Sequence, residues 1–266
     1  MMNKARSVTV VIPARYGSSR FPGKPLADLN GKPMIQHVYE RAVACRVVSD
    51  VLVATDDERI KQAVERFGGR VVMVTGDYRT GTDRVAAVAR MFAGDYFLDL
   101  QGDEIPLHSD LLTDLIEPFL DSGLGMGTLK RVMDPTENLL NSSVVKVVTD
   151  LRGHALYFSR APIPFVRDDP GMQVIGGLHY MHLGLYIYTK ETLLRIAALP
   201  TSRMEDAEKL EQLRALDHGI RIRVWETKHA SLRVDRPEDV PEVADRLQQF
   251  EAIKRELGNS GLFFKS

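Results

Sequence analysis

The chain has 266 residues, of which 44% are hydrophobic and 27% are charged. These values are ordinary for a globular protein, and the length suits one α/β domain that carries an additional lobe. With 35 basic and 36 acidic residues the net charge is −1, which excludes a strongly charged protein and gives no reason to expect nucleic acid or a membrane as a partner. The single cysteine, Cys45, excludes an intramolecular disulfide bond, and the first residues lack the apolar core of a signal peptide, so we expect a cytoplasmic protein.

The first segment with a clear pattern runs from Val8 to Lys24. Its first residues are mostly β-branched and predict a buried strand that ends near Pro13. The loop that follows holds Arg15, Arg20 and Lys24 together with two glycines and two serines. Small residues let backbone amides approach a polyphosphate, and the cations offset its charge, so this composition predicts an anion-binding loop. The alternative is a solvated basic loop without a ligand.

A P-loop is the nearest rival for this segment, and the spacing argues against it. A P-loop has four residues between its two glycines and a hydroxyl residue after its lysine. Here five residues separate Gly17 from Gly23, and Pro25 follows Lys24.

Apolar runs then alternate with segments of helical periodicity. We predict strands at residues 51–54, 71–74 and 96–100, and helices at about 34–42, 57–67 and 85–91. Thr55 or Asp56 is the expected N-cap of the second helix, and Thr82 is an expected N-cap of the third. A helix at 109–120 and a strand at 125–129 continue the alternation. This order predicts a mostly parallel sheet that binds ligands at the carboxyl ends of its strands.

Two polar segments are expected at that edge of the sheet. Residues 76–84 form a polar loop that brings Arg84 to the anion-binding loop. Asp103 follows the strand at 96–100, where it is a candidate ligand for a hard divalent cation; the alternative is a turn carboxylate without a metal.

The pattern changes in the middle of the chain. We expect antiparallel strands at 144–148 and 155–158, a mobile loop at 168–177 and a strand at 180–188 that contains His182. His182 has two possible roles, a histidine buried in the core or a hydrogen-bond donor to the substrate, and both stay open. Further on we expect helices at 190–198 and 205–216, a strand at 220–224 and a closing helix after Asp235. We interpret residues 1–266 as a single domain with an inserted β lobe at about 131–188.

Several motifs together resemble the 3-deoxy-manno-octulosonate (KDO) cytidylyltransferases, also called CMP-KDO synthetases. They lie, in order, at residues 13–26, 101–104, 157–164, 182–186, 210–213 and 234–239. The resemblance implies a Rossmann-like nucleotidyltransferase fold, and proteins of this family are commonly homodimers. The inserted lobe is then expected to serve sugar binding and dimerisation. It also implies Mg²⁺-dependent transfer of CMP from CTP to the anomeric hydroxyl of KDO for lipopolysaccharide synthesis.

The resemblance also assigns roles to residues of this sequence. The implied catalytic residues are Arg15, Lys24, Asp103 and Asp235, of which Asp103 and Asp235 hold the metal. The implied nucleotide-binding residues are Pro13, Ala14, Arg15, Ser18, Lys24, Thr82, Arg84 and Gln101. The implied sugar-binding residues are Gln101, Arg160, His182, Tyr186, Glu211 and Gln212, with Arg160 and His182 as the expected cations for the sugar carboxylate.

The chain departs from the family pattern at residues 78–80, 142–143, 181 and 231–233. These positions surround the expected sugar site, so an 8-amino KDO analogue or another acidic sugar is an alternative substrate. Two other functions stay open: a nucleotidyltransferase that uses a sugar 1-phosphate and another nucleotide, and a nonenzymatic nucleotide sensor.

Overall fold

The computed structural model describes residues 6–18, 20–168 and 173–259. The first half of the chain alternates strands and helices as the sequence predicts. These elements are β1 (Val8–Ala14), α1 (Met34–Val43), β4 (Asp50–Thr55), α2 (Glu58–Arg66), β5 (Val71–Met73), α3 (Gly81–Met91), β6 (Tyr96–Asp99) and α4 (Asp110–Ser122). Two two-residue strands, β2 (Asp28–Leu29) and β3 (Lys32–Pro33), form a hairpin before α1.

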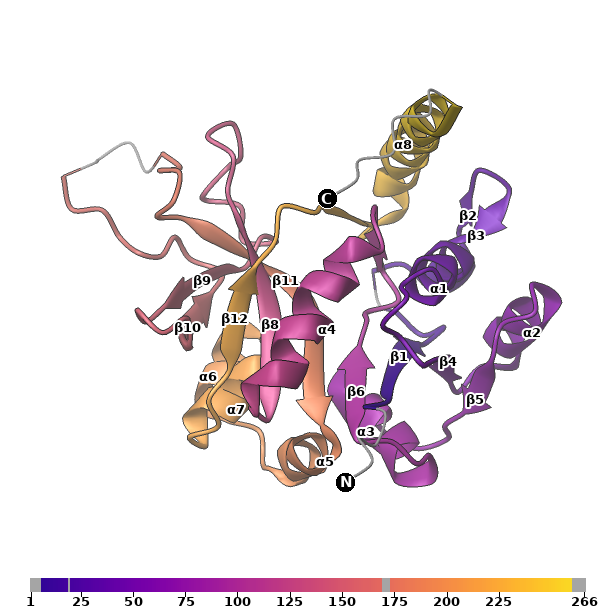
Figure 1. Cartoon of the computed structure of the whole chain (residues 1–266), viewed down its shortest axis with the longest axis horizontal. Coiled ribbons are helices and arrows are strands. Elements are labelled where there is room, and N and C mark those ends of the chain that lie inside the picture. Colours follow the sequence, from indigo (N-terminus) through magenta and orange to yellow (C-terminus); the bar gives the residue numbers. More distant parts are fainter. Residues whose placement is uncertain (1–5, 19, 169–172, 260–266) are drawn as a thin grey trace.

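Nine strands of the described chain form the main sheet, which has helices on both faces (Figure 1). Its later members are β8 (Met126–Val132), β9 (Lys146–Thr149), β10 (Ala155–Ser159), β11 (Tyr180–Thr189) and β12 (Arg223–Glu226). Parallel pairing joins β5, β4, β1 and β6, and β12 also runs parallel to β8. Strand β11 is antiparallel to both β6 and β8. The prediction of a mostly parallel central sheet is therefore confirmed.

Successive side chains of β1 point alternately into two separate layers of the core. Val10 packs into a cluster with residues of α1, α2, α4 and the closing helix α8 (Val240–Asn259). Val11 points the other way, into a cluster with α3 and α5 (Lys190–Ala198). Because side chains of a strand alternate between faces, a strand whose apolar residues lie on both faces must be covered on both. Strand β1 thus lies in the centre of a three-layer α/β/α arrangement.

A short second ladder lies outside the main sheet. Strand β7 (Glu104–Pro106) pairs antiparallel with β13 (Ser231–Arg233), so that Glu104 is opposite Arg233. The sequence analysis did not predict either strand. This ladder matters for the site, because it brings Asp103 and Asp235, which are far apart in the sequence, to the same end of two paired strands.

Three local predictions are wrong. Residues 205–216 are not one helix but two, α6 (Arg203–Glu208) and α7 (Gln212–Asp217), because Lys209 has the left-handed conformation (φ 53°) that ends α6. The N-cap of α2 is Asp57, which accepts a hydrogen bond from the amide of Arg59. The N-cap of α3 is Thr80 rather than Thr82.

Other predictions are confirmed or stay open. Helices α4 and α5 lie where the sequence predicts them, and Cys45 is buried. No helix of the described chain combines the length and apolarity needed to cross a membrane. Residues 169–172 of the predicted mobile loop lie outside the described residues, and the lobe boundaries at about 131–188 stay a prediction.

Candidate active site

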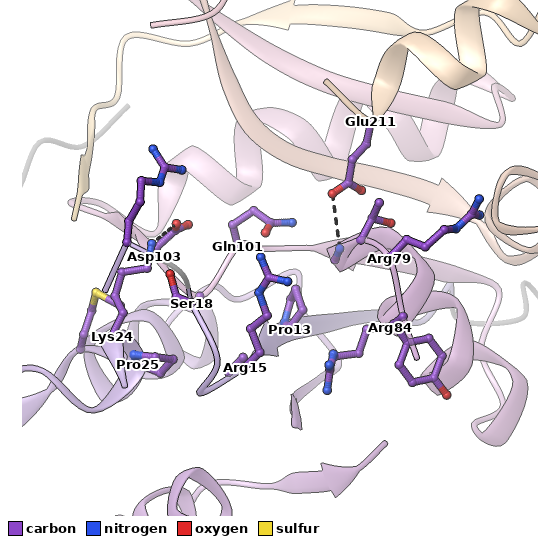
Figure 2. Close-up of a pocket in the computed structure, with 17 residues that line it drawn as sticks. Pro13, Arg15, Ser18, Lys24, Pro25, Arg79, Arg84, Gln101, Asp103 and Glu211 are labelled. Carbon is purple, nitrogen blue, oxygen red and sulfur yellow. Dashed lines mark hydrogen bonds and ion pairs between the residues drawn. The ribbon is translucent and has the colours of Figure 1, made fainter. Parts of the chain in front are cut away.

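A pocket opens at the carboxyl ends of β1 and β6, the edge that the sequence analysis predicted (Figure 2). Three segments and one distant carboxylate meet there. The lining residues are Pro13, Ala14, Arg15, Ser18, Arg20, Lys24, Pro25, Met34, Tyr78, Arg79, Thr80, Gly81, Arg84, Gln101, Gly102, Asp103 and Glu211. Five of these side chains are cations and two are carboxylates, so the pocket carries a local positive charge in a chain whose net charge is only −1. Such a pocket favours an anionic ligand.

The loop after β1 is folded tightly around the carbonyl of Tyr16. The amides of Ser18 and Gly23 donate to that carbonyl at 2.9 and 2.8 Å. Gly23 has φ 74°, and an added Cβ would lie 3.0 Å from the Tyr16 ring, so glycine is needed at this turn. Directly after it, Lys24 begins a 3-10 helix (Lys24–Leu26), which directs its side chain into the pocket.

Lys24 and Asp103 form an ion pair at one end of the pocket. Lys24 Nζ lies 2.5 Å from Asp103 Oδ2 and also donates to the carbonyl of Val234 at 3.1 Å. Burial would raise the pKa of Asp103, but the charges of Arg233 and Lys24 outweigh burial and hold it below its ordinary value. Asp103 is therefore a carboxylate at neutral pH.

Asp235 lies beside this pair but does not line the pocket. Its side chain accepts a hydrogen bond from Arg233 Nε at 3.1 Å, and its amide donates to Asp239 Oδ2 at 2.8 Å. Because β7 pairs with β13, the amide of Val234 contacts the carbonyl of Asp103 at 3.4 Å. The two aspartates therefore lie on adjacent segments of chain. Their carboxylates are hard oxygen ligands, which suits Mg²⁺ held by one or two carboxylates together with substrate phosphates.

The N-terminus of α3 forms the opposite end of the pocket. Figure 2 shows Arg79 and Arg84 at this end, Lys24 and Asp103 at the other, and Arg15 and Gln101 between them. The Glu211 carboxylate accepts from the amides of Gly81 and Thr82, at 3.3 Å each, and so satisfies two free donors of the helix end.

Arg84 is buried within this end of the pocket. Its Nη2 donates to Asp56 Oδ2 at 2.8 Å, and Asp56 follows the carboxyl end of β4. The guanidinium also lies 5.5 Å from the centroid of the Tyr78 ring. These contacts fix the orientation of a cation that the sequence analysis assigned to nucleotide binding.

Gln101 is oriented by a buried carboxyl group. Its Nε2 donates to Asp99 Oδ1 at 2.8 Å, whereas Asp99 Oδ2 is buried and has no hydrogen-bond partner within the described residues. Burial raises the pKa of Asp99 well above its ordinary value, and the nearby Glu211 carboxylate raises it further. Because Gln101 donates to Asp99 through its amide nitrogen, the amide oxygen is left available to a ligand.

Several predicted residues lie outside the main pocket. Thr82, Tyr186 and Gln212 are buried and line a smaller cavity behind it, which shares Thr80 and Glu211 with the main pocket. The Gln212 side-chain nitrogen is buried there without a partner among the described residues.

The expected positive charge on His182 is contradicted. Its Nε2 lies 3.0 Å from Thr128 Oγ1, and the Thr128 hydroxyl donates to the carbonyl of Leu185 at 2.7 Å, so His182 donates and Thr128 accepts. Burial, with a further contribution from the charge of Arg233, lowers the pKa of His182 from 6.5 to about 3. His182 is therefore neutral at physiological pH and cannot neutralise a sugar carboxylate.

The Arg160 guanidinium is partly occupied by backbone carbonyls. Three of its donor nitrogens contact the backbone carbonyls of Glu208, Ser142 and Lys209, at 2.6, 2.9 and 3.3 Å. Neither Arg160 nor His182 lines the main pocket.

The sequence analysis also missed residues. Tyr78 and Arg79 line the pocket, although the sequence analysis noted them only as departures from the family pattern. Arg233 lies opposite Glu104 and contacts Asp235. The position of Arg233 between the two acidic segments follows from the pairing of β7 with β13. Sequence reasoning could not find it, since no turn signal links strands so distant in the sequence.

Comparison with known proteins agrees with this geometry. Residues 9–222 match the family described as cytidylyltransferase. The 3-deoxy-manno-octulosonate cytidylyltransferase of Geobacter sulfurreducens is 49% identical over 249 residues, which cover 91% of this chain and 100% of that protein.

Solved structures show the same relationship. A CMP:2-keto-3-deoxy-manno-octonic acid synthetase complexed with CTP is 42% identical, with a TM-score of 0.84 over 91% of this chain and 99% of that one. A Bacillus anthracis protein named as a glucose-1-phosphate thymidylyltransferase is only 17% identical, but its TM-score of 0.60 over 98% of both chains shows the same fold. The predicted Rossmann-like nucleotidyltransferase fold is confirmed, and the chain is an enzyme of the nucleotidyltransferase class. It belongs to the 3-deoxy-manno-octulosonate cytidylyltransferase family.

Proposed function

We propose that this enzyme transfers CMP from CTP to the anomeric hydroxyl of KDO and releases pyrophosphate. The observation that carries the proposal is the pocket itself, in which five cations from two segments surround a space that ends at the Lys24–Asp103 pair. A cytidylyltransferase name on relatives that share nearly half of their residues with this chain supports the nucleotide and the sugar.

Catalysis of this reaction depends mainly on positioning and electrostatics. The hydroxyl oxygen of the sugar attacks the α-phosphorus in line, while negative charge grows on the departing pyrophosphate. Arg15 and Lys24 extend from the loop that follows β1 and line the pocket, so they are suited to hold the triphosphate and to stabilise the leaving group. Ser18, with the backbone of Pro13 and Ala14, lines the same part of the pocket.

Asp103 and Asp235 are the proposed ligands of Mg²⁺. Asp103 is ionised, and both carboxylates lie at one end of the β7–β13 ladder. When bound, Mg²⁺ would lower the pKa of the attacking hydroxyl and offset charge on the α-phosphate. Lys24 then exchanges part of its contact with Asp103 for the phosphates.

Different side chains of the pocket suit the two halves of the substrate pair. Arg84, fixed by Asp56, is the proposed partner of the cytidine half. Gln101, with its amide oriented by Asp99, and Glu211 are the proposed partners of sugar hydroxyls. The remaining proposed sugar residues are Arg160, Tyr186, His182 and Gln212, with His182 in a neutral role.

We further propose a cytoplasmic homodimer that supplies lipopolysaccharide synthesis, with the inserted lobe as the contact between subunits. Large exposed hydrophobic side chains are concentrated in that lobe; among them are Leu140, Leu151, Leu156, Phe165, Ile175 and Leu178. Exposed apolar groups gathered in one part of a protein are typical of an interaction surface.

The test is an activity assay of the purified enzyme with CTP, KDO and Mg²⁺. Turnover is measured by the release of pyrophosphate and by detection of CMP-KDO. We expect product with CTP and a much lower rate with UTP, and no product when Mg²⁺ is removed by a chelator. An 8-amino KDO analogue in the same assay identifies the preferred sugar. Binding of CTP without any product from either sugar would contradict the proposal and favour a nucleotide sensor.

A further inference from the structure

The β7–β13 ladder continues beyond its strands, away from the two aspartates. The amide of Leu107 donates to the carbonyl of Ala230 at 3.0 Å, so the chains stay side by side after Pro106 and before Ser231. The next residues outward are two histidines, His108 and His229. Their rings stack with centroids 5.2 Å apart and an interplanar angle of 16°.

A carboxylate completes this pair. Asp110 is the first residue of α4, and its Oδ2 lies 3.1 Å from His108 Nδ1. One potential ligand atom from each of His108, Asp110 and His229 lies within 4.8 Å of the others. In residues 6–18, 20–168 and 173–259, no other three imidazole, thiol or carboxylate side chains meet this condition.

The loop that carries His229 is held in place by its surroundings. The amide of His229 donates to Thr227 Oγ1 at 3.1 Å, and that hydroxyl donates to Asp114 Oδ2 at 2.6 Å. Asp114 Oδ2 also lies 3.9 Å from His229 Nε2. Asp114 thus holds the loop through Thr227 and places a carboxylate near the His229 ring, although beyond hydrogen-bond distance from it.

We propose that His108, Asp110 and His229 form a binding site for a divalent transition metal ion such as Zn²⁺. Two imidazoles and one carboxylate suit Zn²⁺, Co²⁺ or Ni²⁺, whereas Mg²⁺ prefers oxygen ligands only. Three protein ligands leave a fourth position for water. His108 and Asp110 are exposed, so an ion reaches the site from solvent without any opening of the fold.

The position of the site suggests what a bound ion does. Five residues of chain, which span at most roughly 17 Å at the rise of a strand, separate Asp103 from His108. None of the three proposed ligands lines the pocket, so the ion would lie outside it. It would instead join the two chains of the ladder at the end opposite Asp103 and Asp235. Because a ligand that binds only the folded state stabilises it, the ion would raise the resistance of this ladder to unfolding.

The experiment measures Zn²⁺ binding to the full chain by calorimetry, in excess Mg²⁺ and without CTP or sugar. It therefore tests this site independently of the proposed function. We expect one Zn²⁺ per chain and a higher midpoint of thermal unfolding with Zn²⁺ than without it. The variants His108→Gln, His229→Gln and Asp110→Asn should each weaken Zn²⁺ binding at least about tenfold, since loss of even an outer partner has such an effect. The matched control is His218→Gln, which should bind Zn²⁺ like the unaltered chain.

Co²⁺ adds a spectroscopic readout that a merely structural histidine pair would not give. We expect the intense visible absorption of four- or five-coordinate Co²⁺ in the unaltered chain and its loss in His229→Gln. The proposal would be overturned if all three variants bound Zn²⁺ as tightly as the unaltered chain. It would also be overturned by Zn²⁺ binding that survives in them but disappears in Asp103→Asn, because the ion would then occupy the aspartate site.

Discussion

Lys24 and Asp103 are 79 positions apart in the sequence, yet the lysine ammonium lies 2.5 Å from the aspartate carboxylate. The same ammonium contacts the carbonyl of Val234, one residue before Asp235. One side chain of the anion-binding loop thus connects that loop with both acidic segments. The Asp103 carboxylate is ionised and lies beside a cation, which avoids the cost of an unpaired buried charge.

Replacement of Asp103 by Asn should abolish most activity while leaving the fold intact. Asn has the same shape and still offers an oxygen to Lys24, but it lacks the negative charge that the proposed Mg²⁺ ligand supplies. We expect kcat to fall by about 10² to 10³, the usual effect of removing one electrostatic contact to a transition state. Pyrophosphate release measures kcat, and thermal unfolding checks the fold.

Asp121→Asn is the matched control for that variant. Asp121 is an exposed carboxylate that pairs with Arg6 and does not line the pocket. Its replacement should leave kcat unchanged. A fully active Asp103→Asn variant would remove Asp103 from the proposed metal site.

The pH dependence of stability should report the neutral state of His182. Its pKa is about 3 in the folded chain and 6.5 as an unperturbed side chain, so between these values the unfolded chain binds a proton that the folded chain does not. The free energy of unfolding therefore decreases as the pH falls from 6.5 toward 3, by up to about 1.4 kcal/mol per pH unit. Urea unfolding at several pH values between 4.5 and 7.5 measures this slope.

His182→Gln isolates the contribution of this group, since glutamine keeps a nitrogen donor for Thr128 but does not titrate. We expect a shallower pH slope in the variant than in the unaltered chain. Equal slopes would mean that His182 is protonated in the folded state. In turnover assays, His182→Ala should raise the KM for the sugar more than the KM for CTP, and an equal rise in both would place the residue away from the sugar.

Much of this fold could be predicted because its signals are local. Strands such as β1 and β4 are apolar runs bounded by polar turns, and α1 has a clear helical period. The β7–β13 ladder could not be predicted in this way, since each strand has three residues and no turn joins them. The break between α6 and α7 lies at Lys209, a residue type that seldom takes the left-handed conformation, and the buried ion pair of Arg214 with Glu205 joins the two helices across it.

The candidate site divides in a similar way. Chain topology alone predicted that Arg15, Lys24 and Asp103 meet, because strand ends in a parallel sheet share one edge. Charge states were beyond the sequence, because they depend on burial by distant segments. His182 is neutral and Asp99 has a raised pKa for this reason.

Asp99→Asn should stabilise the enzyme increasingly as the pH rises. The pKa of Asp99 is higher in the folded chain than its ordinary value of 3.8, so the stabilising contribution of its protonated form is complete below that value. This contribution is lost as the pH rises through the folded pKa. Asn stays neutral and still accepts a hydrogen bond from Gln101, so activity should persist. Unfolding at pH 5, 7 and 9 tests this, and a stability difference that does not change with pH would contradict it.

Glu211 should contribute to stability and to substrate binding through the same carboxylate. Glu211→Ala leaves the amides of Gly81 and Thr82 without their acceptor, which should cost about 0.5–2 kcal/mol, as for a lost helix cap. The same variant should raise the KM for the sugar more than that for CTP. Glu211→Gln keeps one acceptor oxygen and should recover most of the stability, while Asp206→Ala on α6 is the control for loss of an exposed carboxylate. Urea unfolding and initial rates with each substrate measure the two effects. Unchanged stability in Glu211→Ala would show that water replaces the carboxylate at the end of α3. An equal rise in both KM values would exclude a role at the sugar.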